Sequence, residues 1–221
     1  MQLQVMLTSL RGIPYQELIM KLFYAPGTCS LSPHIVAREA GLPIELVKTD
    51  IKAKTTDGGG DYRKTNPLGY VPALQLDDGS ILTEGPAILQ YLADKAPSKA
   101  LAPVNGTPQR YKLQSWLNFI SSEIHKGFSP LFHPAMPDEA KKIARERLST
   151  RFDHLNKHFA GNEYLMGKSF SAPDAYLFTT LRWTVPTKID LEPYPNLVAF
   201  MKRVEARPAV QAAMKAEGLI Q

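Results

Sequence analysis

Residues 20–42 read MKLFYAPGTCSLSPHIVAREAGL, and this stretch decides the fold. Its first five residues are apolar and partly aromatic, which is typical of a buried strand. A turn with proline and glycine follows, and residues 30–40 then predict a helix that Gly41 ends. Residues 44–49 alternate as a second strand. We therefore expect a βαβ unit of about thirty residues, which implies two parallel strands.

A second group of elements follows this unit. Residues 51–66 are polar and glycine-rich, so we expect irregular structure there. Residues 71–76 and 80–83 flank an Asp-Asp-Gly turn, which is typical of an antiparallel hairpin. Residues 84–95 then predict an amphipathic helix. A βαβ unit followed by ββα is the topology of the thioredoxin fold.

The remaining sequence predicts helices alone. Residues 97–108 are rich in proline and lack periodicity, so we interpret them as a linker. The fold class is therefore α/β plus all-α, with a thioredoxin-like domain over residues 20–98 and an all-helical domain over residues 107–221. Residues 1–19 lack the basic start and continuous apolar stretch of a signal peptide. We expect them to be an N-terminal extension outside the fold.

The composition excludes several classes of protein. Apolar residues make up 44% and charged residues 21%, as in ordinary soluble globular proteins. The net charge of +5 comes from scattered basic residues, which argues against nucleic-acid binding and fits attraction of a small anion. No apolar run reaches the roughly 20 residues of a membrane helix. A single cysteine forms no internal disulfide, so a reducing cytoplasm fits best.

Cys29 is the first candidate for chemistry. It lies between the first strand and the first helix, where unpaired N–H groups and the helix dipole lower a thiol pKa. The alternative is a small buried apolar residue. The fourth residue of its Cys-Ser-Leu-Ser sequence is Ser32, which excludes dithiol exchange. A redox cycle at Cys29 would need an external thiol such as glutathione.

Two further positions suggest a peptide-like ligand. A cis bond between Val71 and Pro72 would expose the backbone of Val71 to an extended ligand, whereas an ordinary trans proline at a strand edge is the alternative. Glu84 and Gly85 begin a helix whose free N–H groups suit a carboxylate, while the Glu84 carboxylate suits an ammonium group. Together they fit an α-amino acid, such as the γ-glutamyl end of glutathione. Alternatively, Glu84 simply complements the helix dipole.

The first long helix is predicted by apolar residues at helical spacing: Leu113, Leu117, Ile120, Ile124 and Phe128. A polar face lies beside them. Asn118, Ser122 and His125 lie at i, i+4 and i+7, so we expect them to share a face toward the interdomain cleft. His125 could donate a hydrogen bond to a sulfur, and Lys126 adds charge; a plain surface histidine is the alternative. The remaining candidates are interpreted as surface residues: His133, His154 and His158. No set of His, Cys, Asp and Glu has the spacing of metal ligands.

These segments together resemble a known family. Residues 20–42, NPLGYVPALQLDDG, LTEGPAILQYLAD, WLNFISSEIHKGFSPLF and SAPDAYLF closely resemble beta-class bacterial glutathione S-transferases, in order and from Met20 onward. The likeness is greatest to members associated with aromatic-degradation pathways. It implies a homodimeric cytoplasmic enzyme, in some members periplasmic, that conjugates glutathione to small hydrophobic electrophiles. Glutathione is then a co-substrate, and neither a permanent cofactor nor a metal is required.

The resemblance leaves other activities open. Cys29 could instead support glutathione-dependent thiol–disulfide exchange, reductive dehalogenation or peroxide reduction. A third alternative is non-catalytic storage of glutathione or hydrophobic ligands.

The resemblance also implies roles for individual residues. Cys29 corresponds to the active-site cysteine against the glutathione sulfur, and His125 or Ser30 could supply another hydrogen bond to that sulfur. The glutathione-binding residues that it implies are Cys29, Lys54, Val71, Pro72, Glu84, Gly85, Asn118, Glu123, His125 and Lys126.

Within this set the expected contacts differ. Val71 pairs with the cysteinyl backbone, and Lys54 contacts the glycine carboxylate. Asn118 and Glu123 reach glutathione in the neighbouring subunit. Gly85 stands where many members have serine, and the missing hydroxyl predicts weaker glutathione binding.

Overall fold

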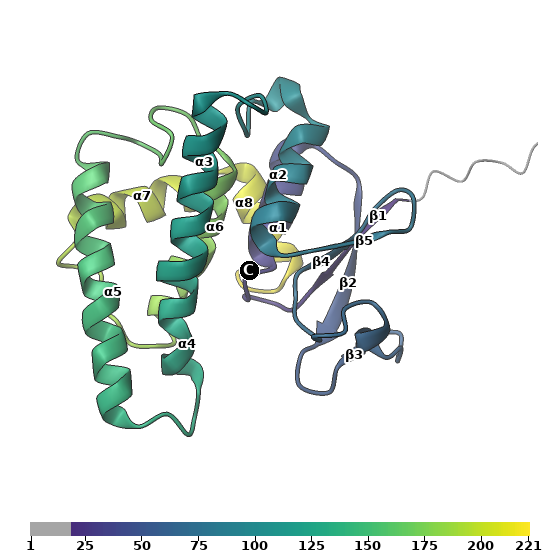
Figure 1. Ribbon diagram of the computed structural model, residues 1–221, viewed down its shortest axis with the longest axis horizontal. Coiled ribbons are helices and arrows are strands. Elements are labelled where there is room, and N and C mark those ends of the chain that lie inside the picture. Colours follow the sequence, from purple (N-terminus) through teal and green to yellow (C-terminus); the bar gives the residue numbers. More distant parts are fainter. Residues whose placement is uncertain (1–18) are drawn as a thin grey trace, which may run out of the picture.

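The computed structural model describes residues 19–221 (Figure 1). The predicted N-terminal extension, residues 1–19, lies outside the described residues except for Ile19. The sheet has five strands in the order β3-β2-β1-β4-β5. The strands are β1 (Met20–Tyr24), β2 (Ile44–Asp50), β3 (Thr55–Thr56), β4 (Ala73–Gln75) and β5 (Ile81–Thr83). The helices are α1 (Leu31–Ala40), α2 (Gly85–Lys95), α3 (Pro108–Phe119), α4 (Lys126–Phe132), α5 (Asp138–Phe159), α6 (Ala172–Leu181), α7 (Pro195–Glu205) and α8 (Pro208–Ala216).

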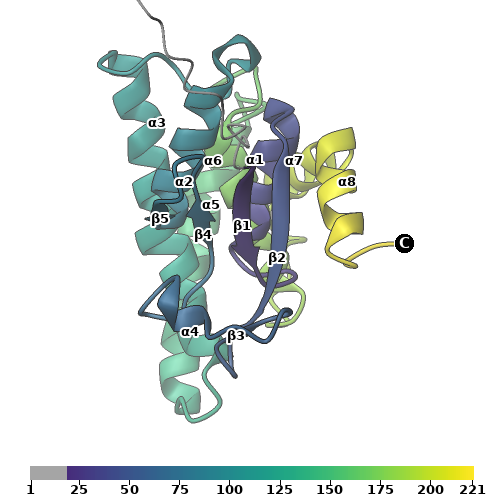
Figure 2. The ribbon, with the colours of Figure 1, turned by 90° about the vertical axis from the view of Figure 1, so that its right-hand side faces the viewer.

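The pairing of the strands confirms the thioredoxin-like topology. β1 pairs in parallel with β2, with Leu22 opposite Leu46, and antiparallel with β4. β4 and β5 form the predicted antiparallel hairpin. Seen from the side, the strands face the viewer and α1 and α2 lie behind them (Figure 2). One face of the sheet is therefore covered by helices, as in other two-layer α/β units.

The segment between β2 and β4 is more regular than we predicted. Thr55–Thr56 forms a short strand antiparallel to β2, and Tyr62–Lys64 forms a single 3-10 turn. The Asp50 carboxylate accepts hydrogen bonds from the N–H groups of Lys52 and Ala53, which holds a tight reversal of the chain. This local hydrogen bonding lets a polar sequence pair with a strand, so the prediction of irregular structure is wrong here.

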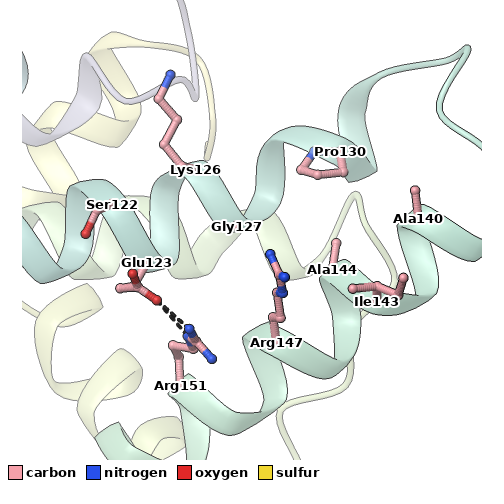
Figure 3. A pocket seen from close by; sticks show the side chains of 10 residues that line it. All are labelled: Ser122, Glu123, Lys126, Gly127, Pro130, Ala140, Ile143, Ala144, Arg147 and Arg151. Atoms are coloured by element: carbon pink, nitrogen blue, oxygen red, sulfur yellow. Dashed lines mark hydrogen bonds and ion pairs between the residues drawn. The ribbon is translucent and has the colours of Figure 1, made fainter.

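The first long helix is interrupted. Its predicted apolar face is fully or almost fully buried, at Leu113, Leu117, Ile120, Ile124 and Phe128. Between α3 and α4, however, Ile120–His125 is π-helical, and the N–H of Lys126 donates to the carbonyl of Ser121. The wider turn changes the spacing of side chains from that of an α-helix. α5 packs beside α4 (Figure 3).

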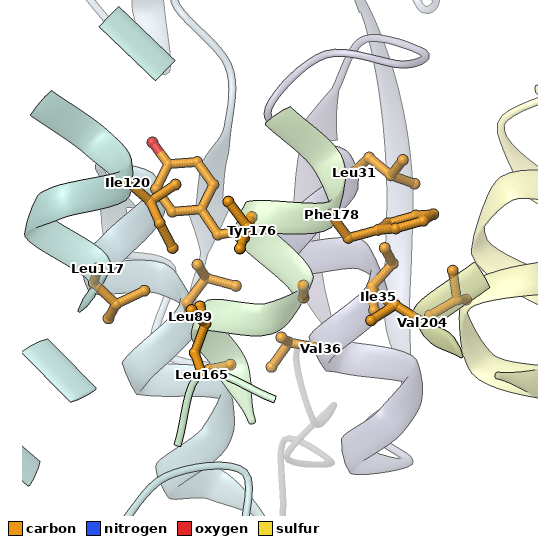
Figure 4. Packing of buried hydrophobic residues seen from close by; sticks show 14 of the residues in the cluster. Leu31, Ile35, Val36, Leu89, Leu117, Ile120, Leu165, Tyr176, Phe178 and Val204 are labelled. Atoms are coloured by element: carbon orange, nitrogen blue, oxygen red, sulfur yellow. The ribbon is translucent and has the colours of Figure 1, made fainter. Parts of the chain in front are cut away.

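One apolar core joins the sheet region to the helices. Ile35 of α1, Leu89 of α2 and Phe178 of α6 are fully buried in the same cluster (Figure 4). α6 begins with a capping box, in which the Asp174 carboxylate accepts from the N–H of Ser171 at 2.8 Å. Among the described residues, no helix is both long and apolar enough to span a bilayer. The shared core fixes the sheet region against the helices. The candidate site lies at the interface between these two regions.

Candidate functional site

Cys29 and Val71 meet at the centre of the candidate site. Cys29 lies in the turn between β1 and α1, half-buried, and its Sγ donates to the carbonyl oxygen of Val71 at 3.2 Å. The Val71–Pro72 peptide bond is cis, which excludes the alternative of an ordinary trans proline. The thiol and the backbone position expected to pair with a ligand are therefore neighbours.

Side chains from the helical region hold the turn before Cys29. The N–H of Gly27 donates to Glu217 Oε2 at 3.0 Å, and its carbonyl accepts from Trp183 Nε1 at 3.0 Å. Gly27 has a φ of 70°, which favours glycine, and a Cβ there would lie 3.3 Å from Leu219 Cδ2. Both backbone groups of this glycine are thus fixed by residues far away in the sequence.

Ser30 is also part of this turn. Its hydroxyl is fully buried, accepts from the N–H of Ala25 at 3.1 Å and lies 2.8 Å from Thr28 Oγ1. The hydroxyl therefore helps to hold the turn in shape. A hydrogen bond from Ser30 to a ligand sulfur stays a prediction.

The Cys29 thiol is protonated at neutral pH. Burial of the thiol and, less strongly, the neighbouring Glu84 carboxylate raise its pKa to about 12. The N–H groups of Cys29 and Ser30 and the charge of Lys126 lower the pKa, but by less. The prediction of a lowered pKa is therefore wrong for the ligand-free protein, because desolvation outweighs the helix N-terminus.

Glu84 immediately precedes α2 in an uncommon backbone conformation. Its φ is 70° and its ψ is 114°, a region that non-glycine residues rarely adopt and that recurs at ligand sites. Its side chain is exposed and makes no ion pair with any residue that the structure describes. Its carboxylate also raises the pKa of the Tyr176 hydroxyl, after burial and Cys29. Among the described residues, the Glu84 carboxylate thus has no ion-pair partner, and it lies near the Cys29 thiol.

Two neighbours of these residues complete this edge of the site. A Cβ added at Gly85 would meet no atom within 4 Å, so a larger side chain fits there. Lys54 Nζ donates to the carbonyl of Gly69 at 2.8 Å and lies 5.6 Å from the ring centre of Tyr70. Lys54 therefore lies beside the segment that leads directly into Val71.

His125 faces the site from the helical region. Its Nδ1 lies 2.7 Å from the hydroxyl oxygen of Tyr176, and its ring centre lies 4.9 Å from that of Trp183. Burial, and then the neighbouring charge of Lys126, lowers the pKa of His125 to about 4. The imidazole is therefore neutral at pH 7. Lys126 lies close enough to affect the Cys29 pKa as well.

The predicted polar face of Asn118, Ser122 and His125 is not a single face. Asn118 and Ser122 are exposed, and Ser122 lines a hollow beside α5, whereas His125 packs against α6. The π-helical turn between them explains the difference, because i, i+4 and i+7 no longer align. His158 also differs from prediction, since it is half-buried against Trp116, with ring centres 4.8 Å apart.

Glu123 forms an ion pair with Arg151 of α5. Its carboxylate accepts from Arg151 Nε at 2.9 Å across the gap between the π-helical segment and α5 (Figure 3). The Glu123 carboxylate is thus engaged by α5, and Asn118 is exposed.

Three residues that the structure places at the site were missed in the sequence. Tyr176 sits in an almost entirely apolar helix, so its hydroxyl was a usable signal. Trp183 and Glu217 contact Gly27 from 156 and 190 positions away, and no local pattern marks such contacts.

Comparison with known proteins agrees with this geometry. The model of the glutathione S-transferase N-terminal domain matches residues 27–95, and that of the C-terminal domain matches residues 119–208. Glutathione S-transferase GstA of Escherichia coli O157:H7 is 49% identical over 201 residues, covering 90% of this chain and 100% of the relative.

Solved structures give the same result. The ternary complex of BphK, a bacterial glutathione S-transferase, has 57% identity and a TM-score of 0.89, covering 90% of this chain and 100% of that one. The beta-class enzyme of Sphingomonas chungbukensis has 48% identity and a TM-score of 0.88 with the same coverage. A sphingomonad glutathione S-transferase complexed with glutathione matches equally well, at 48% and 0.88. This chain belongs to the glutathione S-transferase family and, within it, to the bacterial beta class.

Proposed function

We propose that this protein conjugates glutathione to small hydrophobic electrophiles, as in detoxification. The main support for the proposal is a set of charged and backbone groups near Cys29 that match the groups of glutathione. Glu84 offers a free carboxylate for an ammonium group, and the first N–H groups of α2 suit a carboxylate. Val71 offers backbone to a peptide, and Lys54 offers a cation beyond it. Glutathione carries one ammonium group and two carboxylates at matching ends of a peptide.

The site is suited to stabilising the thiolate of glutathione. Cys29 and Tyr176 both have raised pKa values and stay protonated at neutral pH, so each can donate a hydrogen bond. His125 is neutral and adds no charge. Donors arranged in a partly buried site stabilise a developing or bound anion more than water does. The nucleophile in this scheme is the sulfur of glutathione, and Cys29 acts as a donor.

An aromatic wall beside the turn provides the acceptor site. Trp183 packs edge-on against Phe132, with ring centres 5.7 Å apart, and against His125. Phe132 is 49% exposed although it is large and apolar. Because Trp183 also donates to Gly27, this wall lies directly against the Cys29 turn. It suits a planar hydrophobic electrophile.

The raised pKa of the Cys29 thiol argues against Cys29 as the principal nucleophile. Thiol exchange requires the thiolate, and a pKa of about 12 leaves a negligible fraction of it at neutral pH. We therefore favour conjugation over thiol exchange, dehalogenation or peroxide reduction through Cys29.

A homodimer is part of the proposal, as is a cytoplasmic location. Asn118 is exposed, and the Glu123 carboxylate is held by Arg151 of α5. This placement supports a role for both residues toward glutathione in a neighbouring subunit.

The test is conjugation of glutathione to a chloronitroaromatic acceptor by the purified protein. Wild type should turn over, and Cys29→Ala should retain measurable activity because other donors remain. Trp183→Ala should raise the KM for the acceptor more than the KM for glutathione. Absence of turnover in the wild type would exclude conjugation of this acceptor class. Complete loss in Cys29→Ala would instead favour a mechanism through that thiol.

A further inference from the structure

Tyr176 brings a hydroxyl group from the apolar core to the candidate site. Every residue of α6 is buried, and the Tyr176 side chain belongs to the core that joins the two regions (Figure 4). Burial, the Cys29 thiol and the Glu84 carboxylate all raise the pKa of its hydroxyl, so both groups lie near it. A buried hydroxyl needs a hydrogen-bond partner, and here the partner is His125.

The imidazole ring of His125 is held on two sides. Its Nδ1 lies 2.7 Å from the Tyr176 hydroxyl oxygen, and the Trp183 ring packs against it edge-on, with an angle of 72° between the ring planes. The other ring nitrogen, Nε2, makes no hydrogen bond to any residue that the structure describes, and it is not sealed from solvent. Nε2 is therefore the ring nitrogen that a ligand can reach.

The direction of the bond at Nδ1 decides where the imidazole proton lies. Burial, and then the charge of Lys126, lowers the pKa of His125 to about 4, so at pH 7 the ring carries one proton. A hydrogen bond from Ser121 to the Tyr176 oxygen partly offsets the effect of burial on the pKa of Tyr176. Because that oxygen already accepts from Ser121, its own proton points to Nδ1. The imidazole proton is then left on Nε2.

We propose that Tyr176 is a positioning residue for conjugation: its hydroxyl donates to Nδ1 of His125 and so keeps the imidazole proton on Nε2, where it can be donated to the glutathione sulfur. This inference rests on the proposed function, because it gives His125 a role toward bound glutathione. The bond at one nitrogen of a neutral histidine sets which nitrogen carries the proton. Tyr176 thus acts through His125, while Cys29 donates to the sulfur from the other side of the site.

The first measurement does not depend on turnover. Long-range proton–nitrogen NMR spectra of protein with isotope-labelled histidine distinguish the two tautomers of a neutral imidazole. In the ligand-free wild type at pH 7, we expect the His125 proton on Nε2, and Tyr176→Phe should lose this preference. Tyr194→Phe is the matched control, because it removes another buried tyrosine hydroxyl, 2.8 Å from Ser149 Oγ, and should leave the tautomer unchanged. A proton on Nδ1 in the wild type would overturn the proposal.

The second measurement is conjugation of glutathione to a chloronitroaromatic acceptor. Tyr176→Phe should lower kcat about tenfold, less than the roughly 10²–10³ that follows loss of a donor to the reacting charge itself. The KM for glutathione should change little, because no binding contact is removed. The pKa of the bound glutathione thiol, measured by thiolate absorbance, should rise in Tyr176→Phe and stay unchanged in Tyr194→Phe. An equal loss of kcat in the two variants would show a merely structural role.

A double variant separates action through His125 from direct action on the sulfur. Added to His125→Ala, Tyr176→Phe should lower kcat no further, because the imidazole that it orients is already gone. A further tenfold loss in the His125→Ala background would overturn the proposal. Absence of turnover in the wild type would contradict the proposed function, whereas turnover with the His125 proton on Nδ1 would contradict the role of Tyr176 alone.

Discussion

His34 of α1 and Glu217, just after α8, form a buried pair although 183 positions separate them. His34 Nδ1 lies 3.0 Å from Glu217 Oε1, and both side chains are completely shielded from solvent. Arg38 Nε donates to His34 Nε2 at 2.9 Å, so Nε2 is the acceptor and Nδ1 carries the proton toward Glu217. The other oxygen of Glu217 accepts from Gly27. A chain of hydrogen bonds thus runs from α1 to the turn before Cys29.

Removing Glu217 should strongly destabilise the protein. In Glu217→Ala, the Nδ1–H of His34 and the N–H of Gly27 lose their acceptor, and each buried donor left unsatisfied costs about 1–3 kcal/mol of unfolding free energy. Glu217→Gln should lose less, because an amide oxygen still accepts one bond. Urea unfolding measures both. Glu205→Ala is the control, since its pair with Arg182 is long, at 3.6 Å, and partly exposed. Equal losses in Glu217→Ala and Glu205→Ala would contradict this reasoning.

Glu84→Ala should weaken glutathione binding. Loss of a charged hydrogen bond to an ammonium group costs about 1.5–3 kcal/mol of binding free energy. Isothermal titration with glutathione measures the change, and Glu146→Ala, another exposed acid, is the control. An unchanged affinity in Glu84→Ala would remove this residue from the binding site.

Gly85→Ser should tighten glutathione binding. The position has open space around it, so the hydroxyl can be added without a clash and can donate to a ligand carboxylate. We expect a gain of about 0.5–1.5 kcal/mol, the net value of one hydrogen bond. Gly85→Ala, which adds bulk without a donor, should show no comparable gain. If the alanine variant gains as much, the hydroxyl is not responsible.

Ionisation of Cys29 should occur far above the ordinary range for cysteine. As this is the chain's one cysteine, thiolate absorbance reports on it directly. With a pKa of about 12, the ligand-free protein should show no thiolate rise at about pH 8–9. Glu84→Gln should lower the pKa, because the neighbouring negative charge that opposes ionisation is gone. A thiolate signal near pH 8 in the wild type would mean that burial does not dominate.

The protein should be a homodimer in solution. Multi-angle light scattering at micromolar concentration should give twice the chain mass of 24.6 kDa. A mass equal to one chain would exclude the proposed role of Asn118 and Glu123 across subunits.

The elements of the sheet region could be predicted because their signals are local. The strand at residues 20–24, the helix ended by Gly41 and the Asp-Asp-Gly hairpin all follow from neighbouring residues. The Ser171–Asp174 capping box is a local signal of the same kind. The π-helical turn at Ile120–His125 was not, since its apolar residues have the same spacing as those of an α-helix.

Site chemistry was harder to predict where it depends on packing. The position of Cys29 before a helix indicated a lowered pKa, but the structure buries the thiol against Val71 and reverses the shift. A helix N-terminus can be predicted from a few neighbouring residues. The burial of a side chain cannot, because it depends on the whole fold. For the same reason the contacts of Glu217 and Trp183 with Gly27 left no trace in the local sequence.

The two bonds to Gly27 set an order of assembly during synthesis. A ribosome makes the chain from its N-terminus, so the βαβ unit emerges first and can begin to fold. The N–H of Gly27, however, finds its acceptor only after 190 further residues have been added. The cysteine turn thus reaches its final shape late, once the helices are in place. A nascent chain therefore does not present a finished glutathione site before its helical region exists.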